Sequence, residues 1–187
     1  MKLLPMTAAL IIIDMQNAID APSWGRRNNP EAETVIAGLI AGWRVTGRPV
    51  YHIRHDSNDP SSDYRPGQKG NDFKKEAKPL EGETVIAKHT NSAFIGTDLE
   101  SELKRHGHTP LIVTGVITNN SVEATVRMAG NLGFETYVVS DGVFTFDKTD
   151  LNGRCHPAED VHALSLANMH GEYATVVSSG WLHMRLT

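Results

Sequence analysis

The stretch "TPLIVTGVITNNSVEATVRMAG" (Thr109–Gly130) passes from an apolar run through a short polar segment into a helical pattern. The apolar run is rich in β-branched residues, as is typical of a buried strand. Asn119, Asn120 and Ser121 follow it, and the next apolar residues recur at helical spacing. The stretch therefore predicts a strand, a polar turn and a helix over residues 120–132. It also raises the question of what the hydroxyl of Ser121 does at the turn.

Strand and helix patterns alternate on both sides of this stretch. Further strands are predicted at "AALIII" (8–13), "RPVYHIRHD" (48–56), "ETVIAKH" (83–89), "FETYVVSDG" (134–142) and "YATVVSS" (173–179). Helices are predicted at 30–47, 97–107 and 156–171. Strands that alternate with helices indicate βαβ units and right-handed crossovers. The sequence thus predicts an α/β three-layer sandwich around a six-stranded, mostly parallel sheet.

Polar side chains stand where the predicted strands end. Asp14 ends the first strand, His55 the second and Lys88 the third, and Thr118 and Ser121 follow the fourth. In parallel sheets, ligands bind beyond the carboxyl ends of the strands, so these groups are expected to converge. An acid, a lysine and a hydroxyl in one cleft make a plausible set of nucleophile and base.

The composition is that of an ordinary globular protein and fits one domain over residues 1–187. Hydrophobic residues make up 40% and charged residues 21% of the 187, and the net charge is −4. This charge provides no basic face for nucleic acid and no polybasic segment for a membrane. The apolar run at 8–13 is too short to span a bilayer. The single cysteine, Cys155, excludes an intramolecular disulfide framework and fits a reducing cytoplasm.

Three blocks of the sequence resemble the signature blocks of the isochorismatase-like hydrolases, also called the cysteine hydrolase superfamily. They are "LIIIDMQN", "AKHTNSAFIGTDLE" and "TGVITNNSVEATVRMAGNLGF", in family order and with similar spacing. The resemblance implies a Rossmann-like isochorismatase fold and a catalytic triad of Asp14, Lys88 and Ser121. It also implies an oxyanion hole of the Ile117 and Ser121 N–H groups, with a cis peptide bond between Val116 and Ile117. Such a family member assembles into homo-oligomers, dimers or tetramers, and uses no organic cofactor.

Residues that flank the triad are candidates for substrate contacts. Gln16 is expected to orient Asp14 or Lys88, and Trp24 and Phe94 to form pocket walls. The predicted substrate-binding residues are Gln16, Trp24, His55, Asn91, Phe94 and Thr118. The loops at 17–29, 57–83 and 142–156 would shape the pocket. Strand alternation places His52 and His55 on opposite faces, and the metal-binding pattern of the nicotinamidase branch is absent, so no metal is predicted.

The chain departs from the resembled family at Ser121, where the family's amidases have cysteine. A thiol, with an ordinary pKa of about 8.5, is readily drawn to thiolate, whereas an alcohol must lose its proton during attack. Ser121 could be an introduced replacement of cysteine or a working serine nucleophile in a natural variant. Alternatively, the protein could follow the isochorismatase branch, which hydrolyses a vinyl ether without cysteine, or could only bind a metabolite. The flanking "NNS" differs from the family's usual sequence, which favours a natural variant.

Ser121 could instead cap the helix that follows, since serine is favoured near helix N-termini. Asn120 and Glu123 can form a capping box without it, which would leave Ser121 free to face the cleft. The leading hypothesis is hydrolysis of a small amide or ureide at a non-peptide C–N bond. Asp14 would be the acid and base, Lys88 its electrostatic partner, and Ser121 would stand at the nucleophile position. No nucleic acid or membrane partner is expected.

Overall fold

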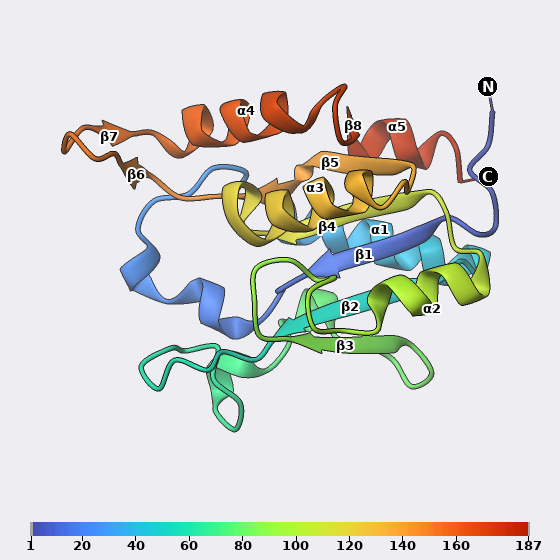
Figure 1. The fold of residues 1–187 in the computed structure, drawn as a ribbon, viewed down its shortest axis with the longest axis horizontal. Coiled ribbons are helices and arrows are strands. Elements are labelled where there is room, and N and C mark those ends of the chain that lie inside the picture. Colours follow the sequence, from blue (N-terminus) through green and yellow to red (C-terminus); the bar gives the residue numbers. More distant parts are fainter. Residues whose placement is uncertain (1, 187) are drawn as a thin grey trace.

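The computed structural model describes residues 2–186, whose main sheet has six strands in the order β3-β2-β1-β4-β5-β8 (Figure 1). Each pair of neighbouring strands is parallel. The strands are β1 (Ala9–Ile13), β2 (Val50–His55), β3 (Thr84–Lys88), β4 (Leu111–Val116), β5 (Thr136–Phe144) and β8 (Thr175–Val177). The predicted α/β fold with six parallel strands is confirmed. From β1 the chain adds β2 and β3 on one side and then β4, β5 and β8 on the other, so the switch in strand order lies between β1 and β4 at the centre of the sheet.

Helices cover both faces of the sheet. Helix α1 (Ala32–Thr46) and the short α5 (Ser179–His183) pack on one face, and α2 (Leu99–His106) and α3 (Glu123–Asn131) pack on the other (Figure 1). Helix α4 (Ala158–Met169) contacts α3 and β8. Side chains of β1 alternate between the two faces. Leu10 and Ile12 belong to the core beneath α1, whereas Ile11 belongs to the core beneath α3. Burial on both faces explains why β1 reads as a continuous apolar run.

The predicted boundaries of the longest helix are nearly those observed. Helix α1 begins two residues after Pro30, and it ends where Gly47 adopts a left-handed conformation with φ 69°. The N–H of Gly47 donates to the carbonyls of Trp43 and Arg44, so the last turn of the helix is satisfied. Turn chemistry visible in the sequence therefore sets this end of α1.

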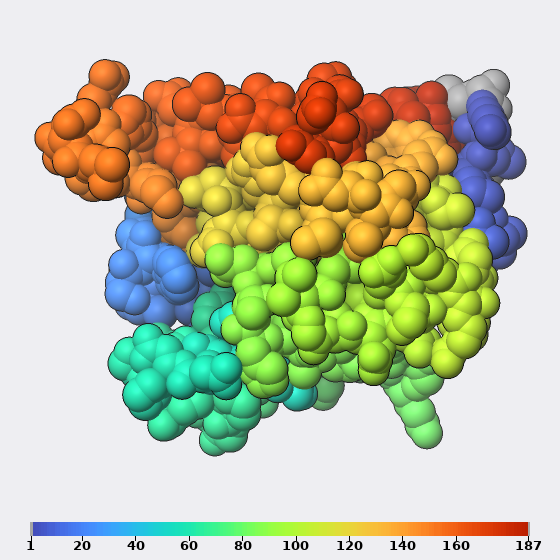
Figure 2. All heavy atoms as spheres, in the orientation of Figure 1, coloured from blue at the N-terminus to red at the C-terminus, as the bar shows by residue number. Residues whose placement is uncertain are grey.

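Several short elements were absent from the sequence prediction. A two-stranded antiparallel hairpin of β6 (Lys148–Thr149) and β7 (Cys155–His156) extends away from the body of the protein (Figures 1 and 2). Single helical turns occupy η1 (Asn17–Asp20), η2 (Pro22–Trp24), η3 (Lys69–Asn71) and η4 (Lys75–Ala77). A π-helical turn, η5 (Thr118–Val122), joins β4 to α3. The loops that were expected to shape a pocket thus contain ordered turns. No helix within residues 2–186 has the length and apolar character needed to cross a membrane.

The two central strands approach closely at Gly115, which pairs with Ile13. Gly115 has φ +116°, and a Cβ atom at this position would lie 2.2 Å from the carbonyl oxygen of Ile13. Only glycine tolerates both this backbone conformation and this contact. The approach brings the residue after β1, Asp14, next to the turn that follows β4. The Val116–Ile117 peptide bond in that turn is cis, as the sequence resemblance implied.

Candidate active site

Asp14, Lys88 and Ser121 meet in one buried cluster at the carboxyl ends of the strands. Asp14 follows β1, Lys88 is the last residue of β3, and Ser121 lies in the turn η5 after β4. The Lys88 Nζ atom donates to Asp14 Oδ2 at 2.7 Å and to Ser121 Oγ at 3.3 Å. The exposed fractions of the three residues are 5%, 0% and 7%. The convergence that the strand ends predicted is therefore present in the structure.

Asp14 has one carboxylate oxygen in use and one free. Its Oδ2 atom accepts from Lys88, whereas Oδ1 is buried and has no hydrogen-bond partner among residues 2–186. Burial raises the pKa of Asp14 above its ordinary value, and the positive charge of Lys88 opposes this rise without cancelling it. A raised pKa makes the carboxylate a stronger base. Asp14 can thus take or give a proton at Oδ1 while Oδ2 stays bonded to Lys88.

Lys88 is fully buried and is the centre of the cluster. Besides Asp14 and Ser121, its Nζ atom contacts the carbonyl oxygen of Thr90 at 3.0 Å and His55 Nδ1 at 3.3 Å. Burial and the positive charge of Lys88 lower the pKa of His55 to about 4. The imidazole is therefore neutral near pH 7, and its Nδ1 lone pair is free to accept from Lys88. His55 thus places a polar but uncharged side chain next to the amine of Lys88.

The structure answers the question that Ser121 raised. Helix α3 begins at Glu123, its N-cap position is Val122, and no side chain caps it. The predicted capping box of Asn120 and Glu123 is therefore wrong. Asn120 has a non-helical backbone (φ −132°, ψ −105°), and the carboxylate of Glu123 pairs with Arg127 at 2.7 Å. Ser121 does not cap the helix either; its hydroxyl points to the amine of Lys88.

The backbone after β4 turns tightly around Ile117. The carbonyl oxygen of Ile117 accepts from the N–H groups of Asn120 at 3.0 Å and Val122 at 3.3 Å. These bonds fold η5 back so that Ser121 lies beside the ends of β1 and β3. A role for the Ile117 and Ser121 N–H groups in an oxyanion hole stays a prediction.

Gln16 lies beside the cluster and has a different set of partners from the expected one. It is fully buried, and its amide donates to the carbonyls of His55 at 3.0 Å and Asn71 at 2.9 Å. Its Oε1 atom accepts from the His55 N–H at 2.7 Å. The sequence had suggested that Gln16 orients the side chain of Asp14 or Lys88. Its side chain instead fixes the backbone of His55, and it acts on the cluster through that residue.

The other predicted contact residues lie at varying distances from the cluster. Phe94 is buried in the core and stacks on Phe134, with ring centroids 5.9 Å apart. Trp24 stacks on Phe146, and its indole N–H donates to a backbone carbonyl of η1. Thr118 is buried and bonds His162 of α4 at 3.1 Å, and Asn91 is exposed. Of the six predicted contact residues, His55 alone has a side chain bonded to Lys88, so the contacts of the others with a substrate stay predictions.

Sequence reasoning missed two buried residues of the 57–83 loop, Tyr64 and Asn71. The ring of Tyr64 packs edge-on against His55, and Asn71 bonds the His55 carbonyl. The length of the loop indicated that it could cover a site, but no periodicity marked which of its residues turn inward.

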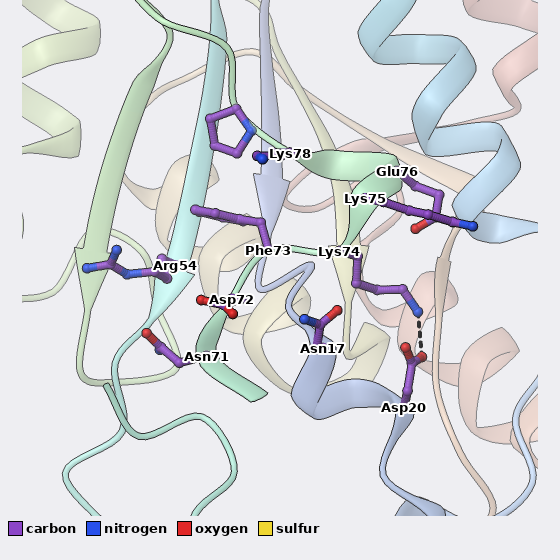
Figure 3. Close-up of a pocket in the computed structure, with 11 residues that line it drawn as sticks. Asn17, Asp20, Arg54, Asn71, Asp72, Phe73, Lys74, Lys75, Glu76 and Lys78 are labelled. Atoms are coloured by element: carbon purple, nitrogen blue, oxygen red, sulfur yellow. Dashed lines mark hydrogen bonds and ion pairs between the residues drawn. The ribbon is translucent and has the colours of Figure 1, made fainter. Parts of the chain in front are cut away.

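A cavity of about 780 Å³ lies beside the cluster, between the end of β2 and the turns η1, η3 and η4 (Figure 3). Asn71 belongs to its wall, whereas Asp14, Lys88 and Ser121 do not. Lys74 points to Asp20 across this cavity and forms an ion pair with it (Figure 3). Arg54 pairs with Asp56 at 2.8 Å. Because none of the three catalytic candidates lines this cavity, it is a separate feature from their cluster.

The two strand histidines have separate partners, as strand alternation predicted. His52 is fully buried and bonds Glu83 at 2.9 Å, while His55 faces Lys88. Within residues 2–186, no three His, Cys, Asp or Glu side chains are grouped so that they could hold a metal ion.

Comparison with known proteins shows the family of the chain. The sequence model of the Isochorismatase domain matches residues 8–180. The chain belongs to the isochorismatase family. The isochorismatase family protein YrdC of Bacillus subtilis is 42% identical over 93% of each chain. A crystal structure of a putative hydrolase of this family from Chromobacterium violaceum has a TM-score of 0.96 and 56% identity, and the match covers 100% of this chain and 96% of the other.

Some relatives within the isochorismatase family carry the name of a reaction. Nicotinamidase 3 of Arabidopsis thaliana is 27% identical, with 96% of this chain and 88% of the relative covered. The ureidoacrylate amidohydrolase RutB of Klebsiella pneumoniae is 28% identical, with 73% of each covered. The family is thus one of hydrolases, and its amidohydrolases are among the relatives of this chain.

Proposed function

We propose that this isochorismatase-family hydrolase cleaves a non-peptide C–N bond in a small amide or ureide. The observation that supports this most directly is the free Oδ1 atom of Asp14, buried beside Lys88 and Ser121. A buried carboxylate oxygen without a partner is costly, and such atoms are candidates for proton transfer. The amidohydrolases among the relatives support the same class of bond.

In the proposed reaction, Ser121 Oγ attacks the carbonyl carbon while Asp14 Oδ1 removes its proton. The N–H groups of Ile117 and Ser121 would stabilise the oxyanion of the tetrahedral intermediate. Asp14 then returns the proton to the leaving nitrogen, the C–N bond breaks, and an acyl ester on Ser121 remains. Water, deprotonated by Asp14, hydrolyses this ester and restores the serine. The products are an acid and an amine or ammonia.

A serine nucleophile needs more help than a thiol, and the cluster provides two forms of it. The raised pKa of Asp14 makes its carboxylate a stronger base than an ordinary one. The hydrogen bond from Lys88 to Ser121 Oγ strengthens as negative charge develops on that oxygen during attack. Burial excludes water from both interactions and increases their strength.

The same geometry fits a second reaction, hydrolysis of a vinyl ether without a covalent intermediate. A raised pKa also favours the protonated form of Asp14, which could then protonate the vinyl carbon as a general acid. Water would add to the resulting cation, and Ser121 would only orient it. In a third possibility, the site binds a metabolite without turning it over.

A hydrolysis screen across small amides, ureides and vinyl ethers distinguishes these functions. The parent chain is compared with Asp14→Asn and Ser121→Ala, and with Ser101→Ala as a matched control on the exposed side of α2. We expect amide or ureide turnover that both site variants lose and the control keeps. An acyl adduct on Ser121, detected by mass spectrometry, supports the covalent route.

Other outcomes of the screen point elsewhere. Vinyl-ether turnover that persists in Ser121→Ala, with no adduct, supports the second reaction. Activity that is unaltered by Asp14→Asn contradicts a catalytic role for the cluster. A gain of activity in Ser121→Cys would mark the chain as an impaired or edited cysteine enzyme.

Assembly into a dimer or tetramer and a cytoplasmic location remain part of the proposal. Light scattering of the purified protein tests the first, and fractionation of cells that produce it tests the second.

A further inference from the structure

Tyr64 is a buried aromatic residue that packs next to the catalytic candidates. Its side chain comes from the 57–83 loop, and only 9% of the residue is exposed. The ring lies edge-on to His55, with centroids 5.6 Å apart and planes at 80°. Because His55 Nδ1 is 3.3 Å from Lys88 Nζ, Tyr64 lies one side chain away from the amine of the cluster.

Asn71 holds Tyr64 in this place. Its amide nitrogen lies 2.8 Å from the Tyr64 carbonyl oxygen, 3.0 Å from the His55 carbonyl oxygen and 3.0 Å from Asp56 Oδ1. Gln16 in turn donates to the Asn71 carbonyl at 2.9 Å. These contacts tie the 57–83 loop to the ends of β1 and β2, so the position of the Tyr64 ring is fixed by the fold.

Tyr64 is buried as a residue, and its hydroxyl makes no hydrogen bond within residues 2–186. The hydroxyl is not among the fully buried polar atoms that lack a partner, so solvent reaches it. Burial, followed by the negative charges of Asp14 and Asp20, raises the pKa of this phenol well above its ordinary value. The phenol therefore stays protonated over the whole physiological range and is a hydrogen-bond donor.

We propose that Tyr64 determines substrate specificity, by donating a hydrogen bond from its hydroxyl to an acceptor atom that the substrate carries beside the scissile bond. This inference rests on the proposed C–N hydrolysis and narrows its substrates to small amides or ureides with a second acceptor, such as an ether or carbonyl oxygen. A rigid, preformed donor discriminates between substrates, because a substrate without the acceptor displaces water from the hydroxyl and returns no hydrogen bond.

Two isosteric amides test this. Methoxyacetamide carries an ether oxygen where butanamide carries a methylene group, so the pair differs only in the second acceptor. Turnover of each is measured for the parent chain and for Tyr64→Phe, which removes the hydroxyl and keeps the ring. Tyr137→Phe is the matched control, because its hydroxyl bonds Glu135 on β5. Binding of each amide to the Ser121→Ala form, with and without Tyr64→Phe, is followed by ligand-observed NMR.

We expect the parent to prefer methoxyacetamide over butanamide. Tyr64→Phe should reduce this preference by about 2-fold to 10-fold, which is the effect of losing one hydrogen bond. The change should appear in KM and in binding for methoxyacetamide, while kcat and KM for butanamide stay near the parent values. Tyr137→Phe should keep the parent preference. A purely structural role for Tyr64 would instead alter both amides equally.

The two readouts separate this inference from the function on which it rests. Preferential binding that Tyr64→Phe abolishes, without turnover of either amide, supports the role of Tyr64 and counts against amide hydrolysis. Turnover with the same preference in the parent and in Tyr64→Phe supports hydrolysis and overturns the role of Tyr64. Neither binding nor turnover of either amide also overturns it.

Discussion

At the scale of single residues, the contact between Asp14 and Lys88 is the most consequential. Both groups are buried, and their atoms are 2.7 Å apart. Removing one member of a buried ion pair leaves an unpaired charge and typically costs about 3–5 kcal/mol, whereas removing both costs much less. We therefore expect Asp14→Asn and Lys88→Met each to destabilise the protein by this amount, and the double variant by clearly less than the sum. Chemical denaturation measures all three.

An exposed ion pair provides the control for this cycle. Lys104 and Glu100 pair at 2.5 Å on the surface of α2. Because solvent screens exposed pairs, Lys104→Met should cost no more than about 1 kcal/mol. Additive effects of Asp14→Asn and Lys88→Met would show that the two groups do not interact in solution, and the proposed site would lose its basis.

Residue-scale predictions from the sequence succeeded where a residue ends a strand. Asp14, Lys88 and Ser121 could be placed together because parallel strands end at one edge, and the family resemblance pointed to the same three. The partners of Gln16 could not be predicted, because they are backbone groups of His55 and Asn71. Backbone positions in a loop leave no pattern in the sequence.

At the scale of elements, the attachment of the 57–83 loop depends on Asn71. Asn71→Ala would leave buried carbonyl oxygens of His55 and Tyr64 without this donor, at a cost of about 1–3 kcal/mol. We expect faster amide hydrogen exchange across the loop in this variant, while β1 and β4 keep their protection. Asn58→Ala, at an exposed position of the same loop, is the control and should exchange like the parent. Equal exchange in both variants would contradict the proposed attachment.

The contact between β1 and β4 leads to a second element-scale prediction. Gly115→Ala would place a Cβ atom 2.2 Å from the Ile13 carbonyl oxygen at a positive φ, so it should destabilise the protein by more than about 1 kcal/mol. Gly38→Ala in α1 is the opposite case, because the nearest atom is 4.0 Å away. Alanine is the better helix former, so Gly38→Ala should be neutral or stabilising by up to about 1 kcal/mol. Thermal denaturation compares them, and equal shifts would contradict the close approach.

The sequence predicted the elements that have a clear apolar pattern. All six strands of the sheet and α1 to α4 appear close to their expected places, because each carries several turns or residues of periodic apolar pattern. The β6–β7 hairpin has two residues in each strand and α5 has five residues, too few for periodicity to register. The capping box failed because Glu123 finds Arg127 as a partner and Asn120 bends the backbone instead.

At the scale of the whole molecule, two partly buried groups contribute to the dependence of stability on pH. The pKa of His55 falls from 6.5 to about 4 on folding, so the unfolded chain binds the proton more readily between these values. For Glu33, burial raises the pKa, but the hydrogen bonds from Arg27 and Lys74 outweigh this effect. The pKa of Glu33 therefore falls from 4.5 to about 2 on folding. Both contributions are complete at neutral pH. The first is lost as pH falls from 6.5 to 4, and the second as pH falls from 4.5 to 2.

We therefore expect the free energy of unfolding to fall as pH is lowered from 7 to 4.5. His55 contributes to this fall together with His52, His108 and His162, whose pKa values burial also lowers. His55→Asn cannot be protonated at this position and should show a shallower slope over the same range. Urea denaturation at each pH measures both, and identical slopes would show that His55 does not titrate abnormally. His183→Asn, at the exposed end of α5, serves as the control for the substitution itself.

The order of the strands sets a further requirement on the amine. Neighbouring strands lie about 4.8 Å apart, so β3 and β1 are separated by roughly 9–10 Å, with β2 between them. The side chain of Lys88 reaches Asp14 only by extending past the end of β2, where its Nζ atom contacts His55 Nδ1. The site thus requires the length of the Lys88 side chain as well as its charge. An amine on a side chain shorter by one methylene group would not contact the carboxylate of Asp14, however basic it was.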